Sequence, residues 1–153
     1  MPRVMVFVDG PNIGRRDDLI RILEVVVRGR NVVATRYYDS QGPDGKTSFH
    51  ELLEGFGMQV TLLPHPRHQE LVDYEIIVDM LSSAYENQFD VAILVSGDVG
   101  FTSAVRKVQG LGKRVEVASF PGQVARELRE GVAELHDLAA LASQVRRHRS
   151  QEL

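Results

Sequence analysis

The sequence predicts an α/β fold: a single-domain three-layer sandwich with a mainly parallel central sheet of about five strands and helices on both faces. Short apolar runs alternate along the chain with longer stretches whose apolar residues recur at three- and four-residue spacings. The 153 residues suffice for about one domain, and no repeat or low-complexity linker divides them. Strands that alternate with helices form a parallel sheet covered on both sides, which gives the three layers.

Five segments have the length and composition of strands. The first, RVMVFV, is an apolar run, and the second, NVVATRYY, is rich in β-branched and aromatic residues. The other three are equally short, as expected for strands buried between two layers of helices. The predicted strands cover residues 3–8, 31–38, 59–63, 90–95 and 114–120.

Five further segments have the periodicity of amphipathic helices. They cover residues 17–28, 47–55, 70–85, 101–111 and 124–141. A break is possible near Gly131 in the last of them. Beyond residue 143 the apolar content falls, so we expect 144–153 to fray. We therefore place the folded domain in residues 1–141 and a basic C-terminal tail in residues 142–153.

Composition excludes several classes of protein. The chain has no cysteine, which excludes disulfides and thiolate metal sites. No apolar run approaches the roughly 20 residues that span a bilayer, and the N-terminus becomes acidic too early for a signal peptide. A cytoplasmic location without membrane contact is therefore the expectation. The net charge of −3 argues against a protein that coats duplex nucleic acid, but it is compatible with a nuclease whose metal neutralises an acidic site.

Polar side chains follow the strands at their carboxyl ends. Asp9 and Asn12 follow the first strand, Asp39 ends the second, and Ser96 and Asp98 follow the fourth. Ligands of open parallel sheets bind outside the carboxyl ends of the strands. If the first and fourth strands are neighbours, Asp9 and Asp98 face one crevice.

Several of these carboxylates have an ordinary structural alternative. Asp39 has the position of a helix N-cap, and Asp73 can begin the helix that follows the third strand. Asp79, six residues later, points to another helical face, where water or an arginine can satisfy it. Asp9, at the end of the best-patterned strand, and Asp98, between two glycines, are harder to explain in this way. Carboxylates that converge repel one another, and such clusters usually persist because a cation occupies them.

Three other motifs are weaker signals. The segment GPDGKT at 42–47 resembles the end of a P-loop, but the first glycine of that motif is serine here and Pro43 lacks an amide, so a surface turn is favoured. The histidines of HPRH, His65 and His68, are either metal ligands or, more often in such a loop, surface groups. The segment RRHR at 146–149 either contacts phosphate or forms a solvated tail.

Three motifs together resemble the NYN domain of the PIN-like nucleases, which includes bacterial LabA-like proteins. They are FVDGPNI, LVDYEIIVDML, and DVAILVSGDVGF followed by GKRVEV, and the similarity runs from about Val4 to Leu138 in the expected order. Each motif alone is weak, but three at matching spacing are specific. The resemblance implies a parallel sheet between helices and an acidic pocket that binds Mg²⁺ or Mn²⁺ and cleaves RNA.

The same resemblance implies roles for particular residues. Asp9 matches the first-strand carboxylate, Asp73 the acidic residue at the start of the long helix, and Asp98 the S-G-D turn. These three are the implied metal ligands and catalytic residues. Asn12 and Ser96 match the polar residues beside them and are the implied substrate contacts.

The chain also departs from the family pattern. Gly100 stands where the family's S-G-D-x-D-F motif has a second carboxylate, and the usual Ala-Asp is absent near Gly131. Glu70 stands where a basic residue is common, and it is a candidate to supply the missing charge. Asp79 matches a second acidic position of the long-helix motif. A site poorer in ligands implies weakened or specialised activity.

Two function classes follow, and the sequence leaves both open. The first is a metal-dependent endoribonuclease with Mg²⁺ or Mn²⁺ as cofactor. The second is a non-catalytic NYN module that binds RNA or a protein partner, which includes a second copy of the chain. A phosphate- or nucleotide-binding doubly wound domain is a third, weaker alternative, because fold alone does not fix function.

Overall fold

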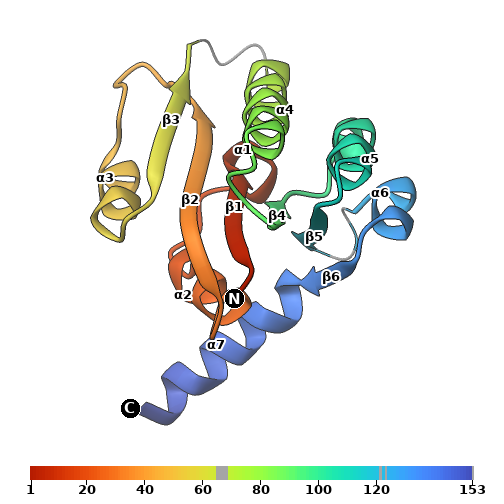
Figure 1. Cartoon of the computed structure of the whole chain (residues 1–153). Helices are drawn as coiled ribbons and strands as arrows, with labels where there is room; N and C mark the ends of the chain where they lie inside the picture. The colour runs from red at the N-terminus through yellow and green to blue at the C-terminus, as the bar shows by residue number, and fades with distance from the viewer. Residues whose placement is uncertain (65–68, 121, 123, 153) are drawn as a thin grey trace.

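A parallel sheet forms the middle layer of the molecule (Figure 1). In the computed structural model, which describes residues 1–64, 69–120, 122 and 124–152, the sheet has six strands in the order β3-β2-β1-β4-β5-β6. Every neighbouring pair is parallel. The strands are β1 Arg3–Asp9, β2 Asn31–Ser40, β3 Gln59–Leu63, β4 Val91–Val95, β5 Arg114–Ser119 and β6 Glu134–Asp137.

Helices form the two outer layers (Figure 1). One face of the sheet packs against α2, α3 and α7, and the other against α4, α5 and α6. A short helix, α1, and a 3₁₀ turn, η1, lie directly after β1 and β4. The bounds are α1 Gly10–Ile13, α2 Leu19–Val26, α3 Ser48–Gly55, α4 Gln69–Tyr85, η1 Val99–Phe101, α5 Thr102–Gly110, α6 Arg126–Gly131 and α7 Leu138–Glu152.

The alternation of side chains along β1 explains why this strand lies in the middle. Val4, Val6 and Val8 belong to the core on the side of α2 and α7, whereas Met5 and Phe7 belong to the core beneath α4 and α5. All five side chains are buried. A strand that is apolar on both faces is stable only where helices cover both, which confirms the predicted three-layer architecture.

The C-terminal part differs from the prediction. The segment expected to be one helix over 124–141 contains α6, the additional strand β6 and the start of α7. The sheet therefore has one strand more than the predicted five. Residues 144–152 continue α7 rather than fray, because Ala142 and Val145 are buried against the core and extend its apolar side by two turns.

The strand order places a switch point between β1 and β4. From β1 the chain proceeds to β2 and β3 on one side, and it then returns to add β4, β5 and β6 on the other. Val8 lies beside Val95 in the ladder, so the residues that follow them, Asp9 and Ser96, leave the sheet side by side. Crevices at such switch points are the usual ligand sites of open α/β sheets.

The turn after β1 requires glycine at position 10. A Cβ atom on Gly10 would clash with the carbonyl oxygen of Tyr38 and would lie 2.7 Å from the Tyr37 hydroxyl oxygen. Backbone and a buried ring cannot move aside easily, so we expect Gly10→Ala to lower the free energy of unfolding by about 1–3 kcal/mol. Urea unfolding of the variant measures this. Gly55→Ala, where a Cβ atom meets nothing within 4 Å, is the matched control and should change stability little.

The GPDGKT segment forms a surface turn, as predicted. Gly42 and Gly45 form an isolated antiparallel β-bridge, Lys46 forms an ion pair with Glu54 at 2.9 Å, and Thr47 caps α3.

No helix in the described part of the chain is long and apolar enough to cross a membrane.

Candidate functional site

Asp9 and Asp98 meet at the switch point through Ser96. The Ser96 hydroxyl donates a hydrogen bond to Oδ2 of Asp9 at 2.8 Å, and it accepts one from the Asp98 backbone amide at 3.2 Å. Both Asp9 and Ser96 are completely buried, whereas the Asp98 side chain is partly exposed. The two carboxylates thus lie together at the switch point between β1 and β4, with Asp9 buried and Asp98 at the surface; this place is called the crevice below.

Asp9 is an unusual carboxyl group. Its Oδ1 atom is buried and has no hydrogen-bond partner of ordinary geometry among the described residues. Burial raises the pKa of Asp9 to about 6, and the charges of Asp98 and Asp39 add to the rise, whereas the Ser96 hydroxyl and the Asn12 backbone amide oppose it. A buried carboxylate oxygen without a donor is costly in the metal-free protein, and a cation would satisfy it.

Two further contacts shape the crevice. The Asn12 side chain accepts a hydrogen bond through Oδ1 from the Gly97 backbone amide at 3.1 Å, which ties the turn after β1 to the turn after β4. Asp98 caps η1, because its Oδ1 atom accepts from the Gly100 amide at 2.8 Å. Asp98 therefore has a structural role, and its second carboxylate oxygen is the one available to a ligand.

The candidate site residues on the long helix α4 do not all lie near the crevice. Asp73 lies in the second turn of α4, next to Val72, which is buried in the core with Phe7 and Phe101. Asp73 is thus near the carboxyl edge of the sheet. The carboxylates of Asp9, Asp73 and Asp98 do not form a triplet whose ligand atoms all lie within 4.8 Å of one another.

Asp79 and the remaining candidates lie elsewhere. Asp79 accepts a hydrogen bond from the Tyr38 hydroxyl at 2.7 Å and lies 3.8 Å from an Arg36 nitrogen, which agrees with the structural interpretation of this residue. Glu70 is in the first turn of α4, and its side chain is outside the described part of the chain. His65 and His68 are also outside the described residues.

A buried histidine holds Asp39 close to the crevice. The Thr47 amide donates to Nδ1 of His50 at 3.1 Å, so the ring proton is on Nε2, which donates to Asp39 at 2.9 Å. Asp39 is therefore not a helix cap; Thr47 caps α3 instead. The charge of Asp39 adds to the effect of burial and raises the pKa of Asp9 and of the Tyr37 hydroxyl. Sequence reasoning missed His50, whose spacing of three from Thr47 is the signal of this capping arrangement.

Two arginines in the loop after α1 were also missed. The Arg15 guanidinium lies 5.5 Å from the centre of the Phe49 ring, and that of Arg16 lies 4.8 Å from the Phe120 ring while it forms two hydrogen bonds with Asp18. Both are on the loop that leaves the site. The signal was present in the sequence as GRR, five residues after Asp9.

A second acidic cluster lies away from the crevice. The ligand atoms of Glu116, Glu134 and His136 are within 4.8 Å of one another. The buried Glu116 carboxylate, however, accepts two hydrogen bonds from Arg30 at 2.7 and 2.8 Å, and further ones from Arg114 and His136. Burial alone would raise the pKa of Glu116, but these donors lower it to about 2. The cluster is therefore an ion-pair network whose oxygen atoms are already occupied.

Comparisons with known proteins agree with this architecture. Residues 3–140 match the model of the family described as NYN domain. The low amplitude and bright protein LabA of Synechococcus elongatus is 26% identical over 92% of this chain and 86% of its own. An uncharacterised protein of Methanocaldococcus jannaschii is 29% identical over 75% of this chain, and the match spans only 46% of that relative's length. A crystal structure of a Vibrio parahaemolyticus protein of unknown function has a TM-score of 0.75 at 24% identity, covering 89% of this chain and 92% of that one, and shows the fold.

Proposed function

Because the chain belongs to the NYN domain family, we propose that it is a metal-dependent endoribonuclease whose site is the crevice between β1 and β4. The observation that carries the proposal is the buried Oδ1 atom of Asp9, which has no partner of ordinary geometry among the described residues, in a carboxyl group whose pKa burial and the charge of Asp98 raise. Mg²⁺ and Mn²⁺ prefer carboxylate oxygens, and one or two carboxylates together with substrate phosphates can hold Mg²⁺. The donor set therefore fits such an ion.

The residues of the crevice have distinct roles in this proposal. Asp9 and Asp98 hold the ion, and Asp73, at the start of α4, completes its environment together with bound RNA. Ser96 fixes the orientation of Asp9 through its hydroxyl, and Asn12 fixes the relative position of the two turns. A divalent ion held here by Asp9 and Asp98 would supply Lewis-acid chemistry, polarising a phosphoryl oxygen and lowering the pKa of an attacking water.

The loop after α1 supplies positive charge for the substrate. Arg15 is exposed beside the crevice, and its charge acts on the Tyr37 hydroxyl, which lies behind Asp9. Arg16 is stacked on Phe120 directly after β5. The Arg15 guanidinium can bind a phosphate that flanks the scissile one, which would otherwise be repelled by the carboxylates, whereas Arg16 would have to exchange its contact with Asp18 for a phosphate.

The test is cleavage of labelled single-stranded and structured RNA with Mn²⁺, with Mg²⁺ and with EDTA. Cleavage that needs the ion and is lost in Asp98→Asn supports the proposal. The absence of cleavage with either ion, from protein that binds RNA, would favour the second candidate, a non-catalytic RNA-binding module. A specific observation favours that candidate: Gly100 stands where the family motif has a carboxylate.

Metal binding can be tested separately from catalysis. An ion that binds only the folded state stabilises it by about 2.7 kcal/mol at a hundred times its dissociation constant. We expect Mn²⁺ to raise the melting temperature of the wild-type protein and to raise that of Asp98→Asn much less. Asp44→Asn, which removes an exposed carboxylate from the 42–45 turn, is the control and should respond as the wild type does. Equal shifts in all three proteins would argue against a metal at the crevice.

A further inference from the structure

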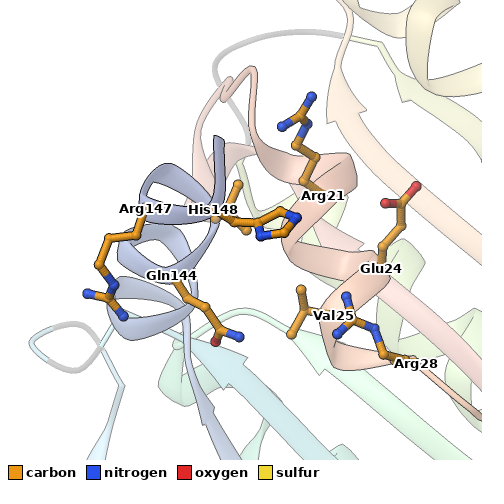
Figure 2. A pocket seen from close by; sticks show the side chains of 8 residues that line it. Arg21, Glu24, Val25, Arg28, Gln144, Arg147 and His148 are labelled. Carbon is orange, nitrogen blue, oxygen red and sulfur yellow. The ribbon is translucent and has the colours of Figure 1, made fainter. Parts of the chain in front are cut away.

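A groove of about 550 Å³ runs between α2 and α7 on the face of the sheet opposite α4 and α5. Figure 2 shows that His148 on α7 points across this groove toward the side chains of α2, while Val25 lies at its floor. The groove is distinct from the crevice of Asp9 and Asp98. Its lining includes Arg21, Glu24, Val25, Arg28, Arg147 and His148.

The charge of the groove is opposite to that of the whole chain. Three arginines and one glutamate line it, although the protein carries a net charge of −3. All four of these side chains are exposed. Within the described residues, no carboxylate lies within 4.0 Å of Arg21, Arg28 or Arg147.

Among the described residues, Arg15, Arg106, Arg129 and Arg146 also lack a carboxylate within 4.0 Å, but only in the groove do three such arginines line one concavity. Six other arginines of the described chain each have a carboxylate within 4.0 Å; these are Arg3, Arg16, Arg30, Arg36, Arg114 and Arg126. Guanidinium groups gathered around one concavity without carboxylate partners repel one another mildly. An anionic ligand removes that repulsion and supplies the bidentate acceptors that arginine prefers.

The spacing of the charges indicates a chain of anions rather than a single one. Arg21 and Arg28 are seven residues apart on one side of α2 and the turn after it, which corresponds to roughly 10 Å at 1.5 Å per residue. Figure 2 shows the Arg21 and Arg28 side chains near opposite ends of α2, so a strand with a phosphate at every nucleotide fits them better than a single phosphate does. The groove is also concave, so a flat membrane surface would not reach its floor.

The loop after α1 and helix α7 approach each other at the start of α2. Asp18, at the start of α2, interacts with Arg16 and with Arg146 of α7, so these two helices meet beside the loop that leaves the site. Arg146 directly precedes Arg147 of the groove. Arg16, which is paired with Asp18 and stacked on Phe120, and Arg146 therefore both act at the place where this loop and the two helices meet.

We propose that the groove between α2 and α7 binds the backbone phosphates of single-stranded RNA that extends from the crevice, an inference that rests on the proposed RNA substrate. Arg21, Arg28 and Arg147 contact successive phosphates. The site gives affinity without sequence preference, because contacts to phosphate carry no base information. RNA too short to reach the groove gains nothing from it.

The test compares RNA binding by the wild type and by the variant Arg21→Glu/Arg28→Glu. Binding is measured from the fluorescence anisotropy of a labelled RNA single strand, in EDTA so that no cleavage occurs. We expect a Kd at least about tenfold higher than that of the wild type. The plot of log K against log salt should lose about 1.4 from its slope, since each phosphate contact on a single strand contributes about 0.7. A short oligonucleotide that fills only the crevice should bind both proteins equally.

The matched control is Arg106→Glu/Arg129→Glu, which makes the same change of charge at two exposed arginines on α5 and α6, on the other face of the sheet. Circular dichroism confirms that each variant is folded. Equal weakening by both variants, or an unchanged salt slope in the groove variant, would overturn the proposal. Displacement of RNA by poly-glutamate at equal charge concentration would also overturn it, in favour of an acidic protein partner.

The failure of this proposal is distinguishable from the failure of the nuclease proposal. If the wild type cleaves no RNA but the groove variant binds RNA more weakly, the groove proposal stands and the nuclease proposal fails. If the wild type cleaves RNA with Mn²⁺ but the groove variant binds RNA as tightly as the wild type, the nuclease proposal stands and the groove proposal fails.

Discussion

Asp9→Asn is expected to abolish RNA cleavage and at the same time to stabilise the metal-free protein at neutral pH. The buried carboxyl has a pKa of about 6 in the fold against an ordinary value of 3.8, so the folded state favours its neutral form. Asparagine has the same shape and carries no charge. Loss of a ligand to the ion should lower the rate of cleavage at least about a hundredfold, because the ion contributes several kcal/mol to transition-state stabilisation.

The direction of the stability change in Asp9→Asn follows from how the free energy of unfolding of the wild type depends on pH. Between about pH 4 and pH 6 the folded wild type binds more protons at Asp9 than the unfolded chain does, so its free energy of unfolding falls as the pH rises. The total loss above pH 6 is about 3 kcal/mol at 1.36 kcal/mol per pKa unit. Asp9→Asn has no carboxyl group to titrate at this position. The difference in free energy of unfolding between this variant and the wild type should therefore grow from pH 4 to pH 6 and remain constant above pH 6.

Urea unfolding in EDTA at several pH values measures this difference. Asp17→Asn, which removes an exposed carboxylate from the loop before α2, is the control and should follow the wild type. Addition of Mn²⁺ should reverse the order of stability at pH 8, because only the wild type keeps both ligands. A variant that is less stable than the wild type at pH 8 in EDTA would show that the donors around the Asp9 carboxylate outweigh the cost of its burial, and the metal hypothesis would lose its main support.

The parts of the structure that the sequence predicts well are those with strong local patterns. The apolar runs of β1 and β4 identify two buried strands, and the parallel arrangement then brings Asp9 and Asp98 to one edge. β6 was missed because it has four residues, of which Leu135 is its one aliphatic side chain. An edge strand of that kind gains its stability from pairing with β5, which no local pattern reveals.

The side chains that complete the site could not be found in the same way. Arg15 and Arg16 are positioned by the rings of Phe49 and Phe120, which are distant in the sequence. His50 is fixed by Thr47, but its contact with Asp39 depends on how α3 packs beside β2. Contacts between elements set these positions, and periodicity along one element carries no information about them.

Gly100→Asp is expected to strengthen metal binding by about tenfold, which corresponds to about 1.4 kcal/mol. Position 100 is exposed in η1, and its φ is not in the left-handed region, so the backbone accepts a side chain. A Cβ atom there would lie 3.3 Å from Oδ1 of Asp98, which brings a second carboxylate to the mouth of the crevice. The start of η1 and α5 also favours negative charge by about 0.3–1 kcal/mol.

The comparison with Gly100→Asn separates charge from shape, because the amide has the same size and no charge. Isothermal titration with Mn²⁺ should show tighter binding for Gly100→Asp and no gain for Gly100→Asn, and the rate of RNA cleavage at low Mn²⁺ should follow the affinity. Without metal, Gly100→Asp should be slightly less stable than Gly100→Asn, since its carboxylate is repelled by Asp98. A folded Gly100→Asp protein with unchanged affinity would mean that the chain has lost more than this one ligand, and the non-catalytic RNA-binding function would then be the better account of the crevice.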